Sequence, residues 1–233
     1  MSGVNNVFDS YYLVLVVPTL ILSAIAQIIV KSTFAKYSKI SCSKNITGQD
    51  SAALLLKANS ILDVRIEAVS GSLTDHYDPS SKVVRLSQPV FAENSIAAVG
   101  VAAHETGHAI QHALSWGPLV LRSTLVPVAN IGSMFGPYLA MAGIIFSIPM
   151  LLNIGIFLFG GAVLFYVITL PVEFNASARA IEILRSNNVL SPDELKGVKK
   201  VLTAAAMTYV ASALTALMSL LRLILLSKSR RRR

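Results

Sequence analysis

Charged residues and cysteine are both scarce in this sequence. Only 14% of its 233 residues are Asp, Glu, Lys or Arg, whereas 54% are hydrophobic, a balance that departs strongly from that of a soluble globular domain. The single cysteine, Cys42, excludes an intramolecular disulfide and lies in a stretch without metal-type spacing. No internal repeat or low-complexity linker divides the chain. We therefore predict a membrane protein in which residues 1–233 form a single unit.

Acidic residues are the minority among the charges, but the excess of basic residues does not indicate nucleic-acid binding. The formal charge is +8 at pH 7. The basic residues stand beside apolar runs, and aromatic residues are not interleaved with them as in a nucleic-acid-binding motif. We therefore expect the lipid bilayer as a partner and no nucleic acid, with the protein in the plasma membrane.

Long uncharged runs predict the membrane spans. Residues 11–30 carry no charge and match the roughly 20 residues that a helix needs to cross the hydrocarbon core. Basic residues follow this run instead of preceding it, which favours an uncleaved anchor over a signal peptide. The 50 uncharged residues from 123 to 172 are enough for two spans, at 127–147 and 151–171. A run rich in Ala, Thr and Ser predicts a fourth span at 201–226.

The residues between the first two spans, 31–122, have a mixed composition that predicts a small α+β segment. A helical pattern covers 48–60, and two strand-like pieces, VRIEAV and KVVRLS, lie on either side of a turn signal at Asp78-Pro79. These pieces predict a hairpin or meander, whose edge could hold an extended peptide or could serve only as scaffolding. The fold class is therefore a mainly α membrane protein with about four transmembrane helices.

The distribution of Lys and Arg predicts which side of the membrane carries this segment. The N-terminal residues before the first span contain no Lys or Arg, whereas the side reached after it carries ten near apolar segments: Lys31, Lys36, Lys39, Lys44, Arg122, Arg179, Arg185, Lys196, Lys199 and Lys200. That side should be cytoplasmic. Four spans would place Lys228 and the arginines at 230–233 outside, so either the last helix lies along the membrane surface or the larger set of charges decides the orientation.

A short motif inside the segment carries the chemistry. His104, Glu105 and His108 form an H-E-x-x-H pattern, which places two imidazoles on one face of a helix with a carboxylate beside them. Two imidazole nitrogens and a third protein ligand suit zinc, and an open fourth position holds a water for which Glu105 is the general base. With 4 His and 6 Glu in the chain, chance would produce the pattern on the order of once in 500 chains. We therefore predict one Zn²⁺ per chain.

The residues around the motif predict a helix from 95 to 115 with one polar stripe. The stripe contains both motif histidines, His112 and further polar side chains at helical spacing, and the remaining positions are apolar. Histidines that face hydrocarbon or a dry core would need partners, so the stripe indicates a wet cleft.

The third ligand must come from another part of the chain. His112 lies eight residues after His104, about 12 Å along a helix, which is too far for one metal ion to span, so we expect it beside the site or without a role. Glu173 is the first charged residue after 50 uncharged ones and begins a helical stretch within 173–200, and we predict it as the ligand. His76 is the rival, although a histidine beside a turn is more often a surface residue.

At this point the sequence resembles a known family. The runs LTDHYDP, SIAAVGVAAHETGHAIQHA and LPVEFNASARA resemble the YugP-like neutral zinc metallopeptidases of bacterial membranes, and the likeness covers almost the whole chain. The fragment EFNAS is also similar to the E-[FY]-x-A-D element of the HtpX and CAAX prenyl protease class, in which the Glu is the third zinc ligand. The resemblance implies that role for Glu173 and peptide-bond hydrolysis as the activity. Ser177 stands where that class has an Asp that orients a ligand histidine.

Two other functions compete with a membrane metalloendopeptidase that acts on peptides or proteins. An intramembrane-cleaving protease fits the nearly uncharged surroundings of the motif, but such enzymes take a ligand Asp from a later membrane helix, and this chain has no Asp between Asp78 and Asp193. A non-catalytic membrane scaffold or chaperone with a retained zinc site is the other alternative. The intact Glu105 argues against it, because a structural site has no use for a general base.

Overall fold

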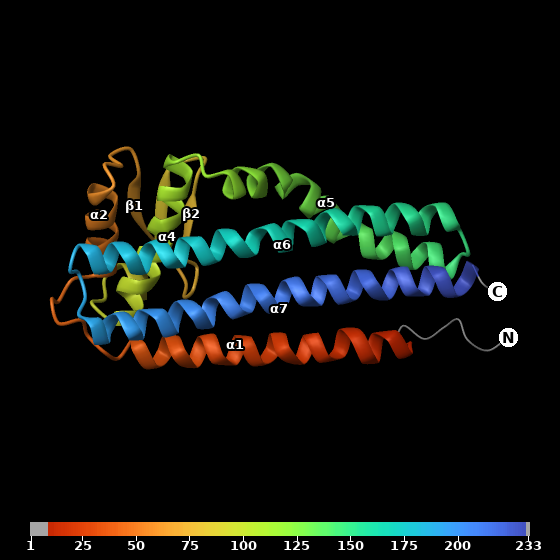
Figure 1. Ribbon diagram of the computed structural model, residues 1–233, viewed down its shortest axis with the longest axis horizontal. Coiled ribbons are helices and arrows are strands. Elements are labelled where there is room, and N and C mark those ends of the chain that lie inside the picture. The colour runs from red at the N-terminus through yellow and green to blue at the C-terminus, as the bar shows by residue number, and fades with distance from the viewer. Residues whose placement is uncertain (1–8, 232–233) are drawn as a thin grey trace. The chain divides into compact units, whose positions relative to one another are not determined.

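The computed structural model describes residues 9–231 and is 75% helical. Its contacts divide the chain into two compact units, each made of several segments. The first unit contains residues up to Gln27 together with Leu121–Leu170 and Thr208 onward. The second unit contains Ile28–Val120 and Pro171–Met207. Several of the long helices that Figure 1 labels contribute residues to both units. The prediction that residues 1–233 work as a single metallopeptidase unit stays a prediction.

Among residues 9–231, four helices are long and apolar enough to cross a membrane. They confirm the predicted class of a mainly α protein with about four spans. The first continues from a π-helical turn, η1 (Tyr12–Val16), and the four helices are α1 (Val17–Tyr37), α5 (Gly117–Ile145), α6 (Pro149–Ser186) and α7 (Pro192–Arg231). Each is longer than the span predicted for it. Arg232 and Arg233, the end of the basic tail, lie outside the described residues.

The third predicted span and the first part of the segment 173–200, which was predicted to carry the third ligand, form one continuous helix, α6, which ends at Ser186. The rest of that segment lies in the turn after α6 and in the first turns of α7. Pro171 lies inside α6, two residues before Glu173. A proline in a membrane helix is tolerated where neighbouring groups satisfy the backbone carbonyl that has lost its partner. The turn that contains Glu173 is thus part of the same helix as the predicted span.

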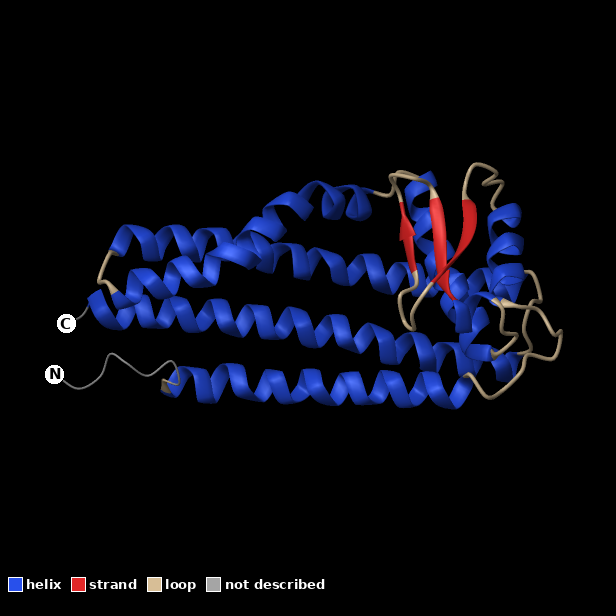
Figure 2. Cartoon of the chain, turned by 180° about the vertical axis from the view of Figure 1, so that it is seen from behind, coloured by secondary structure: helices blue, strands red, loops and turns tan. Residues whose placement is uncertain are grey.

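The small sheet has a different pairing from the predicted hairpin. Strand β3 (Val83–Ser87) lies in the middle, with β1 (Arg65–Val69) parallel on one side and β2 (His76–Asp78) antiparallel on the other. The turn at Asp78-Pro79 therefore joins KVVRLS to the short strand HYD instead of to VRIEAV. Val83, Val84 and Leu86 are fully buried, which explains why β3 takes the central place. Figure 2 shows the three strands in red.

The motif helix α4 (Ile96–Ala113) lies inside the same unit as the sheet. Ser95 caps it by accepting a hydrogen bond from the backbone N–H of Ala98 at 3.1 Å. Its apolar side chains join two hydrophobic clusters: Val99 and Ala103 pack in one, and Ala109 and Ile110 in the other. The first cluster includes residues of α6 and α7, and the second includes residues of the sheet and of helices α2 (Gly48–Ala58) and α3 (Gln88–Phe91).

Gly107 allows α4 and α6 to approach closely beside the motif. A Cβ atom at this position would lie 2.7 Å from the carbonyl oxygen of Ala176, a backbone atom of α6 that cannot move aside cheaply. Any residue other than glycine would therefore push the helices apart. The glycine inside the H-E-x-x-H pattern brings the histidines of α4 within reach of Glu173 on α6.

Candidate metal centre

Three side chains that the sequence marked as metal ligands converge in the second unit. The ligand atoms of His104, His108 and Glu173 all lie within 4.8 Å of one another, and no other such group occurs among residues 9–231. Nε2 of His104 lies 3.3 Å and Nε2 of His108 3.5 Å from Oε2 of Glu173. The side chains are 13%, 11% and 3% exposed, respectively. The arrangement is thus a nearly buried set of two nitrogens and one oxygen.

The two distances from the imidazole nitrogens to the carboxylate oxygen fit a tetrahedral ion. Zinc binds imidazole nitrogen and carboxylate oxygen at about 2.0–2.2 Å, so two ligands of one tetrahedral zinc lie about 3.3–3.5 Å apart. The two nitrogen-to-oxygen distances of 3.3 and 3.5 Å fall in this range. They are longer than an ordinary N–H···O hydrogen bond of about 2.9–3.0 Å. The donor set, two histidines and a glutamate, is one that catalytic zinc sites use.

A hydrogen-bond network determines which nitrogen of His108 carries its proton. The amide nitrogen of Gln111 donates to the carbonyl oxygen of Val172 at 2.9 Å, and a backbone carbonyl can only accept. The other end of the amide, Oε1 of Gln111, therefore faces Nδ1 of His108 at 3.0 Å as an acceptor. Nδ1 must therefore carry a proton. In a neutral His108, Nε2 then has no proton, and its lone pair is directed at the carboxylate of Glu173. Only a cation or a second proton makes that contact favourable.

The side-chain amide of Asn175 belongs to the same network, and its hydrogen bonds determine its orientation as well. Gln111 also donates to Oδ1 of Asn175 at 3.0 Å, and Arg179, which can only donate, approaches the same oxygen at 2.8 Å. Gln111 itself is fully buried. A buried network in which each member has a partner is rigid, so it holds the ring of His108 in one orientation, with Nε2 toward Glu173.

The other motif histidine is oriented from α6. Nδ1 of His104 lies 3.1 Å from Oγ of Ser177. A serine hydroxyl can accept the Nδ1 proton and leave Nε2 for a metal, although it lacks the negative charge of an Asp at this place. Ser177 thus occupies the position beside a ligand histidine that the family resemblance implied, with a neutral group in place of a carboxylate.

The charge balance of the site favours a positive ion. Burial by itself lowers the pKa of His108, but the carboxylate of Glu173 beside it, together with the charge of Glu105, raises that pKa above its ordinary value. The two carboxylates therefore attract a cation to the position between the imidazoles. Glu105 is 9% exposed and follows His104 directly on α4, so a carboxylate lies next to the ligand set without belonging to it.

The remaining candidates, His112 and His76, lie outside the ligand set. Nδ1 of His112 is 2.8 Å from the hydroxyl of Tyr77 on β2, and burial raises the pKa of this hydroxyl to about 12. Nδ1 of His76 is 2.8 Å from the carbonyl oxygen of Thr74, on an exposed part of the sheet. Sequence reasoning missed the roles of Gln111 and Asn175. The only available signal was the position of Gln111 three residues after His108, within the polar stripe.

The sequence of the chain was compared with those of known protein families and known proteins. A family model described as "Putative neutral zinc metallopeptidase" matches residues 12–228. The chain belongs to this family. A relative from Bacillus subtilis (strain 168), "Putative membrane protease YugP", is 49% identical over 215 residues, which cover 92% of this chain and 96% of the relative. No solved structure matches the chain.

Membership in the neutral zinc metallopeptidase family confirms the resemblance drawn from the motifs and accords with the donor set. The family description names zinc, and the group of two histidines and a glutamate is compatible with that ion. The four apolar helices and the name of the relative support a membrane protein. The assignment of individual ligands and of the general base stays a prediction.

Gln111→Leu should weaken zinc binding by about 10- to 100-fold, as loss of a group that orients a ligand histidine typically does. Leucine has a similar volume but cannot accept the Nδ1 proton of His108. His112→Ala, one residue further along α4, should leave zinc content near normal, because His112 lies beyond the ligand set. Competition with a chromophoric chelator measures both affinities. Equal zinc loss in the two folded variants would contradict the orienting role of Gln111.

Proposed function

We propose that this chain is a zinc-dependent membrane metalloendopeptidase that hydrolyses peptide bonds in peptides or proteins. His104, His108 and Glu173 hold one zinc ion, and Glu105 is the general base. The observation that carries the proposal is the convergence of the three ligand atoms within 4.8 Å of one another, with both nitrogen-to-oxygen distances in the tetrahedral range. The carboxylate of Glu105 is on the same helix as the two histidines. Family membership supports the class of reaction.

Glu105 does the proton chemistry in this proposal. When bound, zinc supplies Lewis acidity, which lowers the pKa of water and polarises a peptide carbonyl. Glu105 takes a proton from the attacking water and gives it to the amine that leaves when the C–N bond breaks. Because Glu105 is nearly buried, its carboxylate acts in surroundings where charge is poorly screened. Gln111 and Ser177 keep both imidazoles in the orientation that the reaction requires.

Strand β2 is the best candidate for holding an extended substrate. Among the described strands, β2 is at an edge of the sheet and pairs on one side only, with β3. It also contacts α4, and Tyr77 links it to His112, one turn after His108. An edge strand can pair with a peptide through backbone hydrogen bonds. This place would align a peptide along the helix that carries the motif.

The decisive experiment is to purify the full chain in detergent and to measure zinc and proteolysis together. We expect about one zinc ion per chain and cleavage of a casein-like protein that stops when a chelator removes zinc and returns when zinc is added. Stoichiometric zinc without any cleavage of casein or membrane-protein substrates would favour the scaffold function instead. Cleavage that survives complete zinc removal would contradict the proposal.

We further propose that the site faces the cytoplasm, because the segment that contains it is flanked by membrane-proximal Lys and Arg. A cysteine placed at Ser81, in the exposed turn between β2 and β3, should then resist an impermeant thiol reagent in intact cells. The native Cys42 is buried and gives little background. Ser147→Cys, in the turn between α5 and α6, is the control that should be labelled. Ready labelling at position 81 would move the site to the outer side.

A further inference from the structure

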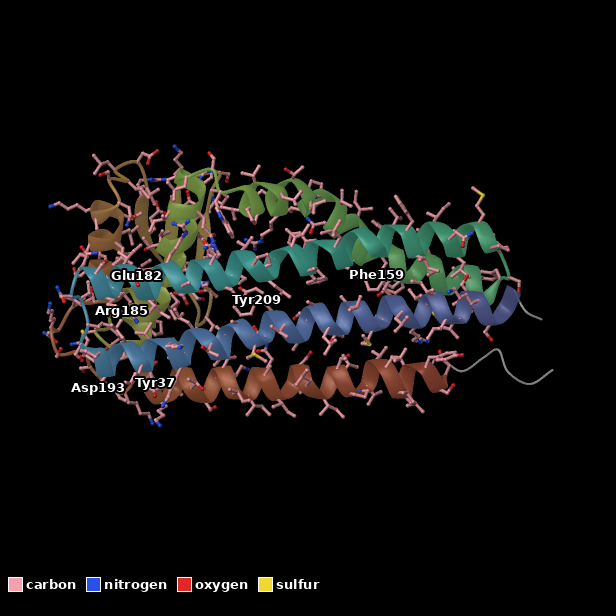
Figure 3. The ribbon with its side chains drawn as sticks, in the orientation of Figure 1. Tyr37, Phe159, Glu182, Arg185, Asp193 and Tyr209 are labelled. Carbon is pink, nitrogen blue, oxygen red and sulfur yellow. The ribbon has the colours of Figure 1, made fainter. Side chains whose placement is uncertain are left out.

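The second unit contains a groove that the proposed chemistry does not use. It lies between the C-terminal part of α1 and the N-terminal part of α7 and has a volume of about 620 Å³. The two helices lie side by side there, since a Cβ atom at Gly197 would be 2.9 Å from the ring of Tyr37. Tyr37 and Asp193 mark this end of the helix pair in Figure 3.

The groove has one apolar end and one basic end. Ile29 of α1 and Met207 of α7 line the apolar end, and their side chains are 47% and 44% exposed. Lys36, Lys199 and Lys200 line the other end, about 10 Å further along both helices by the helical rise. Apart from lysines, no charged residue lines the groove. Its lining is thus complementary to a molecule with an anionic head and an apolar tail.

The lysines at the basic end remain available for a ligand. A fourth lysine of the groove, Lys196, pairs with Asp193 at 2.8 Å. Among the residues that the structure describes, no carboxylate forms an ion pair with Lys36, Lys199 or Lys200. All three are exposed. Three ammonium groups that no carboxylate pairs with form a local concentration of positive charge.

The groove also lies at the depth at which lipid headgroups are found. The uncharged run of the first span ends at Val30, and that of the last begins at Val201, directly after Lys200. The apolar end of the groove therefore belongs to the uncharged part of both helices, and the lysines belong to the first turns outside it. A free phosphate would use only the lysine end, whereas a lipid would use both ends at once.

We propose that this groove binds one anionic glycerophospholipid. Lys36, Lys199 and Lys200 hold its phosphate and headgroup, and an acyl chain lies along Ile29 and Met207. Bound in this way, the lipid would join α1 to α7 beside the cluster that contains Tyr37, Ile96 and Val198. The inference is independent of the chemistry at the metal centre.

Native mass spectrometry of the purified full chain can test the lipid site directly. After incubation with equal amounts of phosphatidylglycerol and phosphatidylcholine, the wild-type protein should retain one phosphatidylglycerol in preference to phosphatidylcholine. The triple variant Lys36→Gln, Lys199→Gln, Lys200→Gln should bind it roughly 100-fold more weakly, because each membrane-proximal lysine contributes a factor of roughly five. The matched control Lys31→Gln, Lys39→Gln, Lys57→Gln removes the same charge outside the groove and should retain the lipid.

Two further arms separate a lipid from a free anion. Met207→Trp fills the apolar end without changing any charge, so it should reduce phosphatidylglycerol retention as well. Inorganic phosphate should displace the lipid no better than chloride at equal ionic strength. The proposal is overturned if phosphatidylcholine is retained equally, if the triple variant and its control behave alike, if Met207→Trp has no effect, or if inorganic phosphate displaces the lipid. Unchanged circular dichroism establishes that each variant is folded.

Discussion

Glu105→Gln should purify with about one zinc ion per chain and yet hydrolyse peptide bonds about 10²- to 10⁴-fold more slowly than the wild-type protein. Glutamine has nearly the same shape as glutamate, so the packing around this nearly buried side chain should be kept. An amide cannot take a proton from water at neutral pH. The ligand atoms of His104, His108 and Glu173 are unaffected by the change. Zinc content is measured by mass spectrometry and activity by casein cleavage.

The control for this variant is Glu93→Gln, which makes the same chemical change at an exposed position shortly before α4. It should retain both zinc and activity. A Glu105→Gln protein that cleaves casein at the wild-type rate would assign the general base to another group. A variant that loses its zinc would instead make Glu105 part of the metal cage.

The motif helix and the spans could be predicted because their signals are local. The predicted helix at 95–115 corresponds to α4 at Ile96–Ala113, since the cap at Ser95 and the polar stripe both lie within the helix itself. The uncharged runs predicted four apolar helices for a similar reason: the length of a span is set by the bilayer. Glu173 was identified as a candidate because a carboxylate after 50 uncharged residues is unusual.

Features that depend on contacts between distant residues were not predicted. The parallel pairing of β1 with β3 depends on which strand is buried in the middle of the sheet, and both strand-like pieces have similar local patterns. The role of Gln111 depends on the carbonyl of Val172, 61 residues away. The close approach at Gly107 likewise depends on Ala176. In each case the local sequence permits several partners, and only packing selects one.

Glu173→Ala should fail differently from Glu105→Gln, by losing zinc and hydrolysis together. The substitution removes one of the three proposed ligands and the negative charge that faces both imidazoles at 3.3 and 3.5 Å. Loss of a group that merely orients a ligand costs about 10- to 100-fold in metal affinity, so loss of a ligand should cost more than about 100-fold. Glu173 is buried, and Glu173→Gln, which leaves no cavity, should also bind zinc weakly. Equilibrium dialysis against zinc measures the affinity of each variant.

Glu182→Ala is the matched control on the same helix. Nine residues of helix rotate Glu182 about 180° away from Glu173. The carboxylate of Glu182 pairs with Arg185 at 3.3 Å on an exposed surface. Glu182 and Arg185 are labelled in Figure 3. Because an exposed pair contributes little to stability, this variant should keep both its fold and its zinc. If Glu173→Ala keeps its zinc while Glu182→Ala or His76→Ala loses it, another residue completes the cage. The assignment of Glu173 would then be wrong, whereas the two histidines of α4 would remain as ligands.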